Sequence, residues 1–194
     1  MKKTIIYAVA LALVLALAFF GYSALKGKYK PEVDLAPPAA QDDKDSLPSE
    51  SEAEKTKAPD IVLIDTDGNE TKLSSLQGKP VVLNFWASWC GPCKGEMPDF
   101  QNVYDEYKDK VNFVMLNLTD GSRETVESAS ALINEMGYTF PIYFDSNGEG
   151  AQKYSISGIP TTFIIDSNGN VMGYIQQAIP ADVLKDALDE LLAQ

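Results

Sequence analysis

A short apolar segment that runs into two closely spaced cysteines constrains this sequence more than any other feature. The segment Val81–Trp86 is rich in β-branched and aromatic residues, a composition typical of a buried strand. Cys90 and Cys93 follow it and are the only cysteines of the chain. Beyond them, apolar residues recur every three or four positions, which predicts an amphipathic helix over 94–108. The cysteine pair is therefore expected where a buried strand turns into a helix.

This position favours redox chemistry. At the start of a helix, unpaired backbone N–H groups and the positive end of the helix dipole stabilise the thiolate, which is the reactive form of cysteine. A C-x-x-C pair beside a strand–helix pattern is typical of a redox site. We therefore interpret Cys90 and Cys93 as a redox-active pair.

Three other interpretations of the pair fit the sequence less well. A structural disulfide between Cys90 and Cys93 would close a very small loop, to which the loop-entropy model assigns roughly 2 kcal/mol. A zinc site needs four ligands, and the chain has no further cysteine and no histidine. Two inert buried cysteines would not need the flanking Trp89, Gly91 and Pro92. The sequence thus predicts no metal and no cofactor.

Length and charge set the wider limits. With 194 residues, the chain has room for one domain of ordinary size and additional segments. Its formal net charge of −12 argues against nucleic acid as a partner, because the phosphates would be repelled. The same charge argues against binding to anionic lipid through a basic face.

The first residues are typical of a membrane segment. Ile5–Leu25 contains no charged residue and would form a helix of roughly 30 Å, about one hydrocarbon thickness. We expect 1–26 to be an uncleaved signal anchor, and a signal peptide cleaved near Ala16–Ala18 is the alternative. Lysines lie on both sides of the apolar stretch, so positive charge does not decide its orientation. The signal-like start favours an amino terminus inside and the rest of the chain outside.

The remaining sequence divides into a linker and a folded domain. Residues 27–57 are rich in proline and acidic residues and poor in aliphatic ones, which predicts a flexible linker. Residues 58–194 carry the patterns of regular structure, and we expect them to form the redox domain.

Within this domain, apolar runs and turn residues predict strands alternating with helices. The predicted elements are a β-hairpin over 61–73, a helical turn at 74–76, strands at 81–86, 111–118 and 140–144, helices at 94–108, 123–136 and 148–155, a hairpin joining 161–166 to 171–176, and a helix at 180–192. Ser122 is the predicted N-cap of the helix that ends at Gly137. Pro141 is expected at a strand start or in an edge strand. The pattern predicts an α/β fold with a mixed central sheet and helices on both faces.

Two segments resemble the thioredoxin superfamily. Asn84–Cys93, with Pro98 five positions beyond, is similar to its active-site segment, and Gly158–Phe163 resembles its cis-proline loop. Three further stretches, at 58–60, 73–79 and 122–144, resemble the membrane-anchored, extracytoplasmic TlpA/ResA-like branch of thiol–disulfide oxidoreductases. The resemblance implies a thioredoxin-like fold with an N-terminal β-hairpin and a central helix–strand insertion.

The resemblance also implies roles for individual residues. Cys90, at an exposed first position, would attack a substrate disulfide, and Cys93 would resolve the mixed disulfide. Pro160 would be cis, and the backbone of Ile159 would bind the substrate chain. Trp89 would be a contact surface beside the sulfur atoms, although a tryptophan here can also simply pack. Gly91 and Pro92 would belong to the same substrate-binding surface.

Glu96 is a candidate proton carrier. Cytoplasmic thioredoxins have a buried aspartate six positions before the first cysteine, where this chain has Asn84, which does not exchange protons. Glu96 matches an acidic position of the ResA-like branch and lies three residues beyond Cys93, on the same helix face. We expect it to reach back toward the sulfur atoms and to manage the proton of Cys93. The alternative is a first-turn glutamate that complements the helix dipole.

The resulting functional prediction is a monomeric extracytoplasmic reductase of protein disulfides. A membrane-embedded thiol carrier would supply its electrons, and apocytochrome c or a methionine sulfoxide reductase is a candidate substrate. The Gly-Pro between the cysteines resembles reducing thioredoxins rather than oxidising foldases. A thiol peroxidase is one alternative, although Ala87 stands where those enzymes have a threonine. A copper-delivery module is another, although it calls for a wider cysteine spacing and a histidine.

Overall fold

The computed structural model describes residues 56–193. The predicted anchor, 1–26, and all but the last two residues of the predicted linker, 27–57, lie outside this range. Within it, no helix has the length and the apolar character needed to cross a bilayer.

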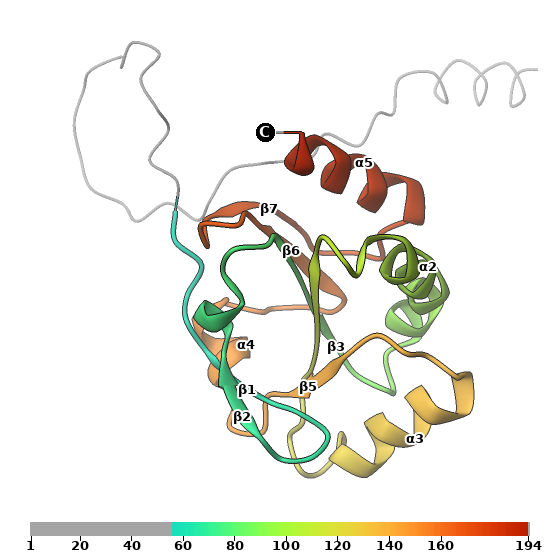
Figure 1. Ribbon diagram of the computed structural model, residues 1–194. Coiled ribbons are helices and arrows are strands. Elements are labelled where there is room, and N and C mark those ends of the chain that lie inside the picture. The colour runs from blue at the N-terminus through green and yellow to red at the C-terminus, as the bar shows by residue number, and fades with distance from the viewer. Residues whose placement is uncertain (1–55, 194) are drawn as a thin grey trace, which may run out of the picture. The chain divides into compact units, whose positions relative to one another are not determined.

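The domain is built on one mixed sheet with the strand order β2-β1-β5-β4-β3-β6-β7. The strands are β1 (Val62–Ile64), β2 (Glu70–Lys72), β3 (Val81–Trp86), β4 (Asn112–Asn117), β5 (Ile142–Phe144), β6 (Thr161–Ile165) and β7 (Val171–Ile175). β3, β4 and β5 are parallel, whereas β6 and β7 on one side and β1 and β2 on the other pair antiparallel. Figure 1 shows β3 near the middle of this sheet.

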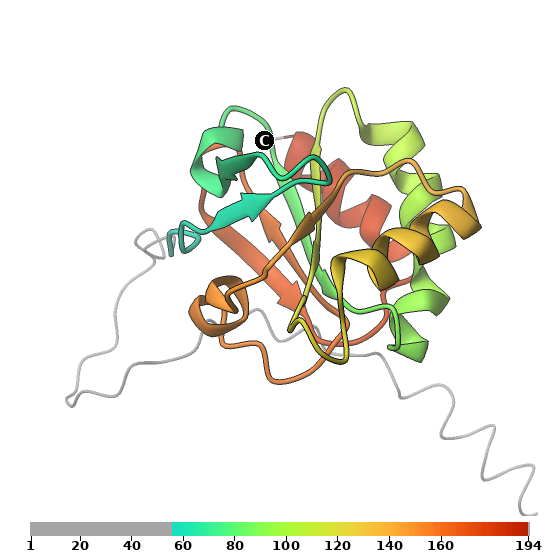
Figure 2. The same ribbon diagram turned by 90° about the horizontal axis from the view of Figure 1, so that it is seen from below.

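The helices are η1 (Leu73–Leu76), α2 (Gly91–Tyr107), α3 (Val126–Met136), α4 (Glu149–Lys153) and α5 (Ala181–Leu192). They lie on both faces of the sheet (Figures 1 and 2). On one face, Phe100 of α2, Ile133 of α3 and Leu188 of α5 share an apolar cluster with the sheet. On the other, Leu73 of η1 and Tyr154, directly after α4, belong to a second cluster. The predicted thioredoxin-like architecture is therefore confirmed, with its N-terminal hairpin β1–β2 and its insertion α3–β5.

The central strand explains why the sequence folds this way. All six residues of β3 are buried, and successive side chains of a strand point to opposite faces. Val82 and Trp86 accordingly belong to the cluster under α2, whereas Leu83 and Phe85 belong to the cluster on the opposite face. A strand that is apolar at every position except Asn84 thus suits a sheet covered on both faces. It delivers the following cysteines to one end of the sheet.

The predicted start of α3 is wrong. Its N-cap is Thr125, whose side chain accepts a hydrogen bond from the Ser128 backbone in a capping box. Ser122 lies instead in a loop in which the Asp120 carboxyl group accepts hydrogen bonds from the backbone N–H groups of Ser122 and Glu124. This local closure competes with helix formation, so α3 begins one turn later than expected. Its predicted end is confirmed, because Gly137 caps α3 with a positive φ of 70°.

Two smaller expectations need adjustment. The strand expected over 140–144 is shorter than predicted, because β5 begins at Ile142, directly after Pro141, and it lies inside the sheet rather than at its edge. In α5, whose sequence indicates an apolar face with Val183, Leu184 and Leu188, the two leucines are buried but Val183 is 40% exposed. The buried face of this helix is therefore narrower than its sequence indicates.

Candidate active site at the start of α2

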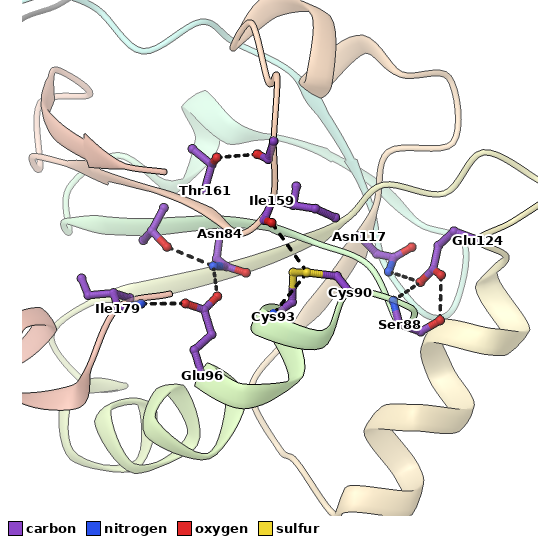
Figure 3. The surroundings of a disulfide bond; sticks show 12 residues. Asn84, Ser88, Cys90, Cys93, Glu96, Asn117, Glu124, Ile159, Thr161 and Ile179 are labelled. Carbon is purple, nitrogen blue, oxygen red and sulfur yellow. Dashed lines mark hydrogen bonds between the residues drawn. A yellow bond between two sulfur atoms is a disulfide. The ribbon is translucent and has the colours of Figure 1, made fainter. Parts of the chain in front are cut away.

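Cys90 and Cys93 form a disulfide at the first turn of α2 (Figure 3). Cys90 is the N-cap of the helix, and the backbone N–H of Cys93 donates to the Cys90 Sγ atom at 3.2 Å. Gly91 and Pro92 are the first two helical residues, a place where proline loses no hydrogen bond. The helix thus begins three residues before the predicted 94, and the sulfur of Cys90 faces the N–H groups at its start.

The prediction of an exposed Cys90 is wrong for this disulfide form. Cys90 is 4% exposed and Cys93 is completely buried. The Cys90 Sγ atom lies 3.7 Å from the carbonyl oxygen of Ile159, so the proline loop lies against it. A disulfide sulfur carries no proton, and this approach is a close contact rather than a hydrogen bond. Cys90 is nevertheless the cysteine that retains some surface.

The proline loop faces the disulfide because of strand pairing. The Ile159–Pro160 bond is cis, as the resemblance implies. Pro160 leads directly into β6, and Thr161 of β6 pairs with Phe85 of β3. Because β3 also leads to Cys90, the sheet brings two segments that are distant in sequence to the same end (Figure 3).

Glu96 lies beneath the disulfide and is 3% exposed. Its Oε1 atom accepts a hydrogen bond from Asn84 Nδ2 at 2.9 Å, and its Oε2 atom accepts one from the Ile179 N–H at 3.0 Å. Burial raises the pKa of Glu96 to about 7, while these two hydrogen bonds act in the opposite direction. In the disulfide form, the carboxyl group therefore bonds to Asn84 and Ile179 (Figure 3). The prediction that it reaches back to the sulfur atoms is wrong for this form. Its burial also separates it from an ordinary first-turn glutamate on a solvated surface.

Asn84 extends this arrangement into the sheet. Besides Glu96, its Nδ2 atom donates to the Thr162 hydroxyl of β6 at 3.0 Å. Its Oδ1 atom is one of two buried side-chain polar atoms without a hydrogen-bond partner in residues 56–193, the other being Trp86 Nε1. Asn84 therefore serves as a donor that orients Glu96.

A second buried carboxyl group lies on the other side of the disulfide. Glu124 is fully buried and accepts hydrogen bonds from the Ser88 backbone N–H at 2.8 Å, from Ser88 Oγ at 2.7 Å and from Asn117 Nδ2 at 2.6 Å. Trp89, directly before Cys90, is 43% exposed. The guanidinium group of Arg123 lies 3.6 Å from the centre of its ring. This arrangement joins the residues before Cys90 to the loop before α3.

Sequence reasoning missed Glu124, Ile179 and Thr162. The only signal near Glu124 was the acidic character of the loop, which is shared by much of this chain. Asn117 and Thr119 match a glycosylation pattern, but Asn117 is fully buried and its amide is bonded to Glu124. No group of three or more potential metal-ligating side chains occurs in the part of the chain that the structure describes.

A disulfide at a helix start, facing a cis-proline loop on a thioredoxin-like sheet, defines the class of this protein: it is a thiol–disulfide oxidoreductase. The chain belongs to the AhpC/TSA family, which matches it over residues 55–173.

Named relatives agree with this class. A protein named thiol-disulfide oxidoreductase ResA from Oceanobacillus iheyensis is 42% identical over 142 residues, which cover 71% of this chain and 72% of the relative. The crystal structure of StoA from Bacillus subtilis has 32% identity and a TM-score of 0.58, and the match covers 66% of this chain and 95% of StoA. A Chlorobium tepidum structure described as a putative thiol:disulfide interchange protein DsbE has 34% identity and a TM-score of 0.62, with coverage of 74% and 97%.

Proposed function

We propose that the protein reduces disulfide bonds of other proteins outside the cytoplasmic membrane, with Cys90 and Cys93 as its dithiol. The observation that carries the proposal is the Cys90–Cys93 disulfide at the first turn of α2, next to the cis-proline loop. This disulfide is the form that the enzyme reaches after it has given two electrons to a substrate.

The reaction has two exchange steps. The Cys90 thiolate attacks one sulfur of the substrate disulfide, forming a mixed disulfide and releasing the other substrate sulfur as a thiolate, which takes up a proton. The Cys93 thiol then loses its proton, and its thiolate attacks the Cys90 sulfur. The Cys90–Cys93 disulfide forms, and the second substrate thiolate leaves and takes up a proton. One substrate disulfide becomes two thiols, and one enzyme dithiol becomes a disulfide.

Glu96 is the proposed acceptor of the Cys93 proton. A group whose pKa is about 7 is present in both protonation states near neutral pH, which suits it to general acid–base catalysis. Glu96 lies one helical turn beyond Cys93 and in the same interior. In the reduced enzyme, its carboxylate takes the proton as Cys93 attacks.

The proposed substrate-binding surface surrounds Cys90. It consists of Trp89, Gly91, Pro92, Ile159 and Pro160. Trp89, Gly91 and Pro92 are exposed and directly flank Cys90 at the start of α2. The backbone of Ile159 lies outside the strands, at the start of the segment that becomes β6, so an extended substrate chain can pair with it as an added strand.

The proposed cellular arrangement follows from the amino-terminal sequence. Residues 1–26 anchor the protein in the membrane, and residues 27–57 serve as a linker to a redox domain that begins at 58. A membrane-embedded thiol carrier returns the disulfide to the dithiol. Apocytochrome c and an oxidised methionine sulfoxide reductase are the candidate substrates, and the protein acts as a monomer.

Trapping tests the proposal. In the full chain with Cys93→Ser, the mixed disulfide on Cys90 cannot be resolved, so mass spectrometry of the isolated protein is expected to find a substrate protein attached to Cys90. Cys90→Ser is the matched control and is expected to trap none. Equal adducts on the two variants would contradict the assigned roles. A midpoint potential near −120 mV, which is typical of a disulfide donor, would contradict the reducing direction.

A further inference from the structure

A buried carboxyl group, that of Glu124, lies on the side of the disulfide formed by the loop before α3, which we call the loop side. The exchange steps proposed above do not use this group. Glu124 accepts three hydrogen bonds although it lies in a loop before α3. Two come from Ser88 and one from Asn117. Burial of a carboxyl group is unfavourable unless donors satisfy it, so the two hydrogen bonds from Ser88 fix this residue against Glu124.

The position of the carboxyl group is set from the sheet. Asn117 is the last residue of β4, where it pairs with Trp86 at the end of β3. Its Oδ1 atom accepts a hydrogen bond from the Thr119 hydroxyl at 2.8 Å, which directs its Nδ2 atom toward Glu124. Glu124 therefore connects the end of one buried strand to the loop that follows its neighbour.

The same loop also contacts Trp89. The backbone carbonyl of Glu124 accepts hydrogen bonds from the N–H groups of Asp120 and Gly121, which closes the loop on itself. Arg123, the preceding residue, stacks on the Trp89 ring. Trp89 thus lies between Ser88, which Glu124 holds, and Cys90, which the helix holds as its N-cap.

We propose that Glu124 is a positioning residue for exchange with protein disulfides. Its carboxyl group holds Ser88 (Figure 3), so that Trp89 remains exposed beside Cys90 and contacts the polypeptide on the substrate side of the disulfide. The inference rests on the proposed attack of Cys90 on protein substrates. None of the hydrogen bonds of Glu124 goes to a cysteine, so its loss is expected to impair docking of a polypeptide more than the exchange itself.

The test compares two substrates and two substitutions in the full reduced chain. Insulin supplies a protein disulfide, and bis(2-hydroxyethyl) disulfide supplies the same bond without a polypeptide. Glu124→Ala removes all three acceptor contacts. Glu124→Gln preserves them, because its carbonyl oxygen replaces Oε1 and its amide donates to the Ser88 hydroxyl, which can reverse.

We expect Glu124→Ala to lower kcat/KM for insulin at least ~10-fold, chiefly through KM, and to change the rate with the small disulfide less than ~3-fold. Glu124→Gln is expected to stay within ~3-fold of the wild type on both substrates. The two-dimensional NMR signal of the Trp89 indole is expected to shift in the alanine variant and to stay in place in the glutamine variant. Equal losses on the two substrates, or no loss on insulin, would overturn the proposal.

Asp166→Ala is the matched control. Asp166 is another buried carboxyl group and accepts hydrogen bonds from Asn168 and Asn170. It follows Ile165, which pairs with Val81 at the end of β3 opposite the cysteines. Its loss is expected to lower stability and to leave the ratio of the two substrate rates unchanged. If Asp166→Ala also changed the ratio of the rates with the two substrates, general destabilisation would explain the effect of Glu124→Ala, and the proposal would fail.

Two further results keep the outcomes distinct. If Glu124→Ala does not fold, Ser88→Ala replaces it, because it removes only the hydroxyl contact of Ser88. This variant is expected to lose ~3-fold on insulin alone, and an unchanged substrate ratio would overturn the proposal. If the wild type reduces neither substrate, the proposed reductase function fails, whereas an active wild type with an unaffected Glu124→Ala variant refutes only the role of Glu124.

Discussion

The two sides of the disulfide differ in how they use a buried carboxyl group. On the helix side, Glu96 is 3% exposed, and its hydrogen bonds come from Asn84 and the Ile179 backbone. On the loop side, Glu124 is fully buried, and its three hydrogen bonds come from Ser88 and Asn117. The same functional group lies in two different environments, one within the core beneath Cys93 and one beside the residues that precede Cys90.

The difference teaches how a small redox site divides its tasks. The pKa of Glu96 is raised to about 7, which makes this group able to exchange a proton under physiological conditions. Two of the three donors to the Glu124 carboxyl group belong to Ser88, so this carboxyl group can hold the backbone before Cys90 in place. We therefore assign proton transfer to the helix side and presentation of the substrate surface to the loop side. Three predictions test that assignment.

The largest expected effect concerns stability as a function of pH. The pKa of Glu96 is raised from 4.5 to about 7 in the folded disulfide form, chiefly by burial, so between these values the folded state binds a proton that the unfolded state has lost. Its contribution to stability is complete below about pH 4.5, falls as the pH rises, and is lost above about pH 7. The loss amounts to about 3 kcal/mol at most.

Chemical denaturation of the oxidised protein at pH 5 and pH 8 measures this effect. Glu96→Gln does not titrate and is the control, because it leaves every other ionisable group in place. The difference between wild type and variant in the free energy of unfolding should change by most of that amount between pH 5 and pH 8, because a part of it is already lost at pH 5. Parallel pH profiles for the two proteins would show that Glu96 is not the titrating group.

The next effect concerns the second exchange step. With Glu96→Gln, we expect resolution of the mixed disulfide by Cys93 to slow by at least ~10-fold near pH 7, because the proton acceptor is lost. Quenched-flow analysis of a preformed mixed disulfide on Cys90 measures the rate. Asn84→Ala is the informative companion, since it removes a hydrogen bond that lowers the pKa of Glu96 and should move the pH–rate midpoint upward. An unchanged resolution rate in Glu96→Gln would remove the helix side from proton transfer.

The smallest effect concerns Arg123 on the loop side. A cation over an exposed aromatic ring contributes about 0.5–1 kcal/mol, so Arg123→Ala should lower the free energy of unfolding by no more than this. It should also make Trp89 more accessible to acrylamide quenching. Arg123→Lys retains the charge but not the planar group, so its Trp89 quenching should lie between that of the wild type and that of Arg123→Ala. Full retention of Trp89 shielding in Arg123→Ala would show that the stacking does not order the ring.

Much of the fold could be predicted because the relevant signals are local. The predicted boundaries of β3, Val81–Trp86, are those observed, since a strand buried on both faces is apolar at nearly every position, and Asn84 is its one polar residue. The end of α3 at Gly137 was equally readable, because a positive φ at a helix end favours glycine. Predicting the redox pair required only the C-x-x-C spacing and the patterns of the neighbouring strand and helix.

The two errors have separate causes, one within a short loop and one across the sheet. Ser122 has the side chain of a good N-cap, but Asp120 and Glu124 close a competing loop around it. Cys90 was expected to be exposed, but the loop at Ile159 lies against it through the pairing of β6 with β3. Contacts within the loop thus overrode the N-cap preference of Ser122, and contacts across the sheet overrode the expected exposure of Cys90.

The sequence by itself therefore determined the sheet, the place of the cysteines and the chemistry that their spacing permits, because these depend on residues close together in the chain. Only the tertiary structure decided which hydrogen-bond donors each of the two buried carboxyl groups meets. The donors to Glu96 and Glu124 come from Asn84, Ile179, Ser88 and Asn117. Strand pairing and the packing of α2 bring these residues together, and no local pattern in the sequence records it.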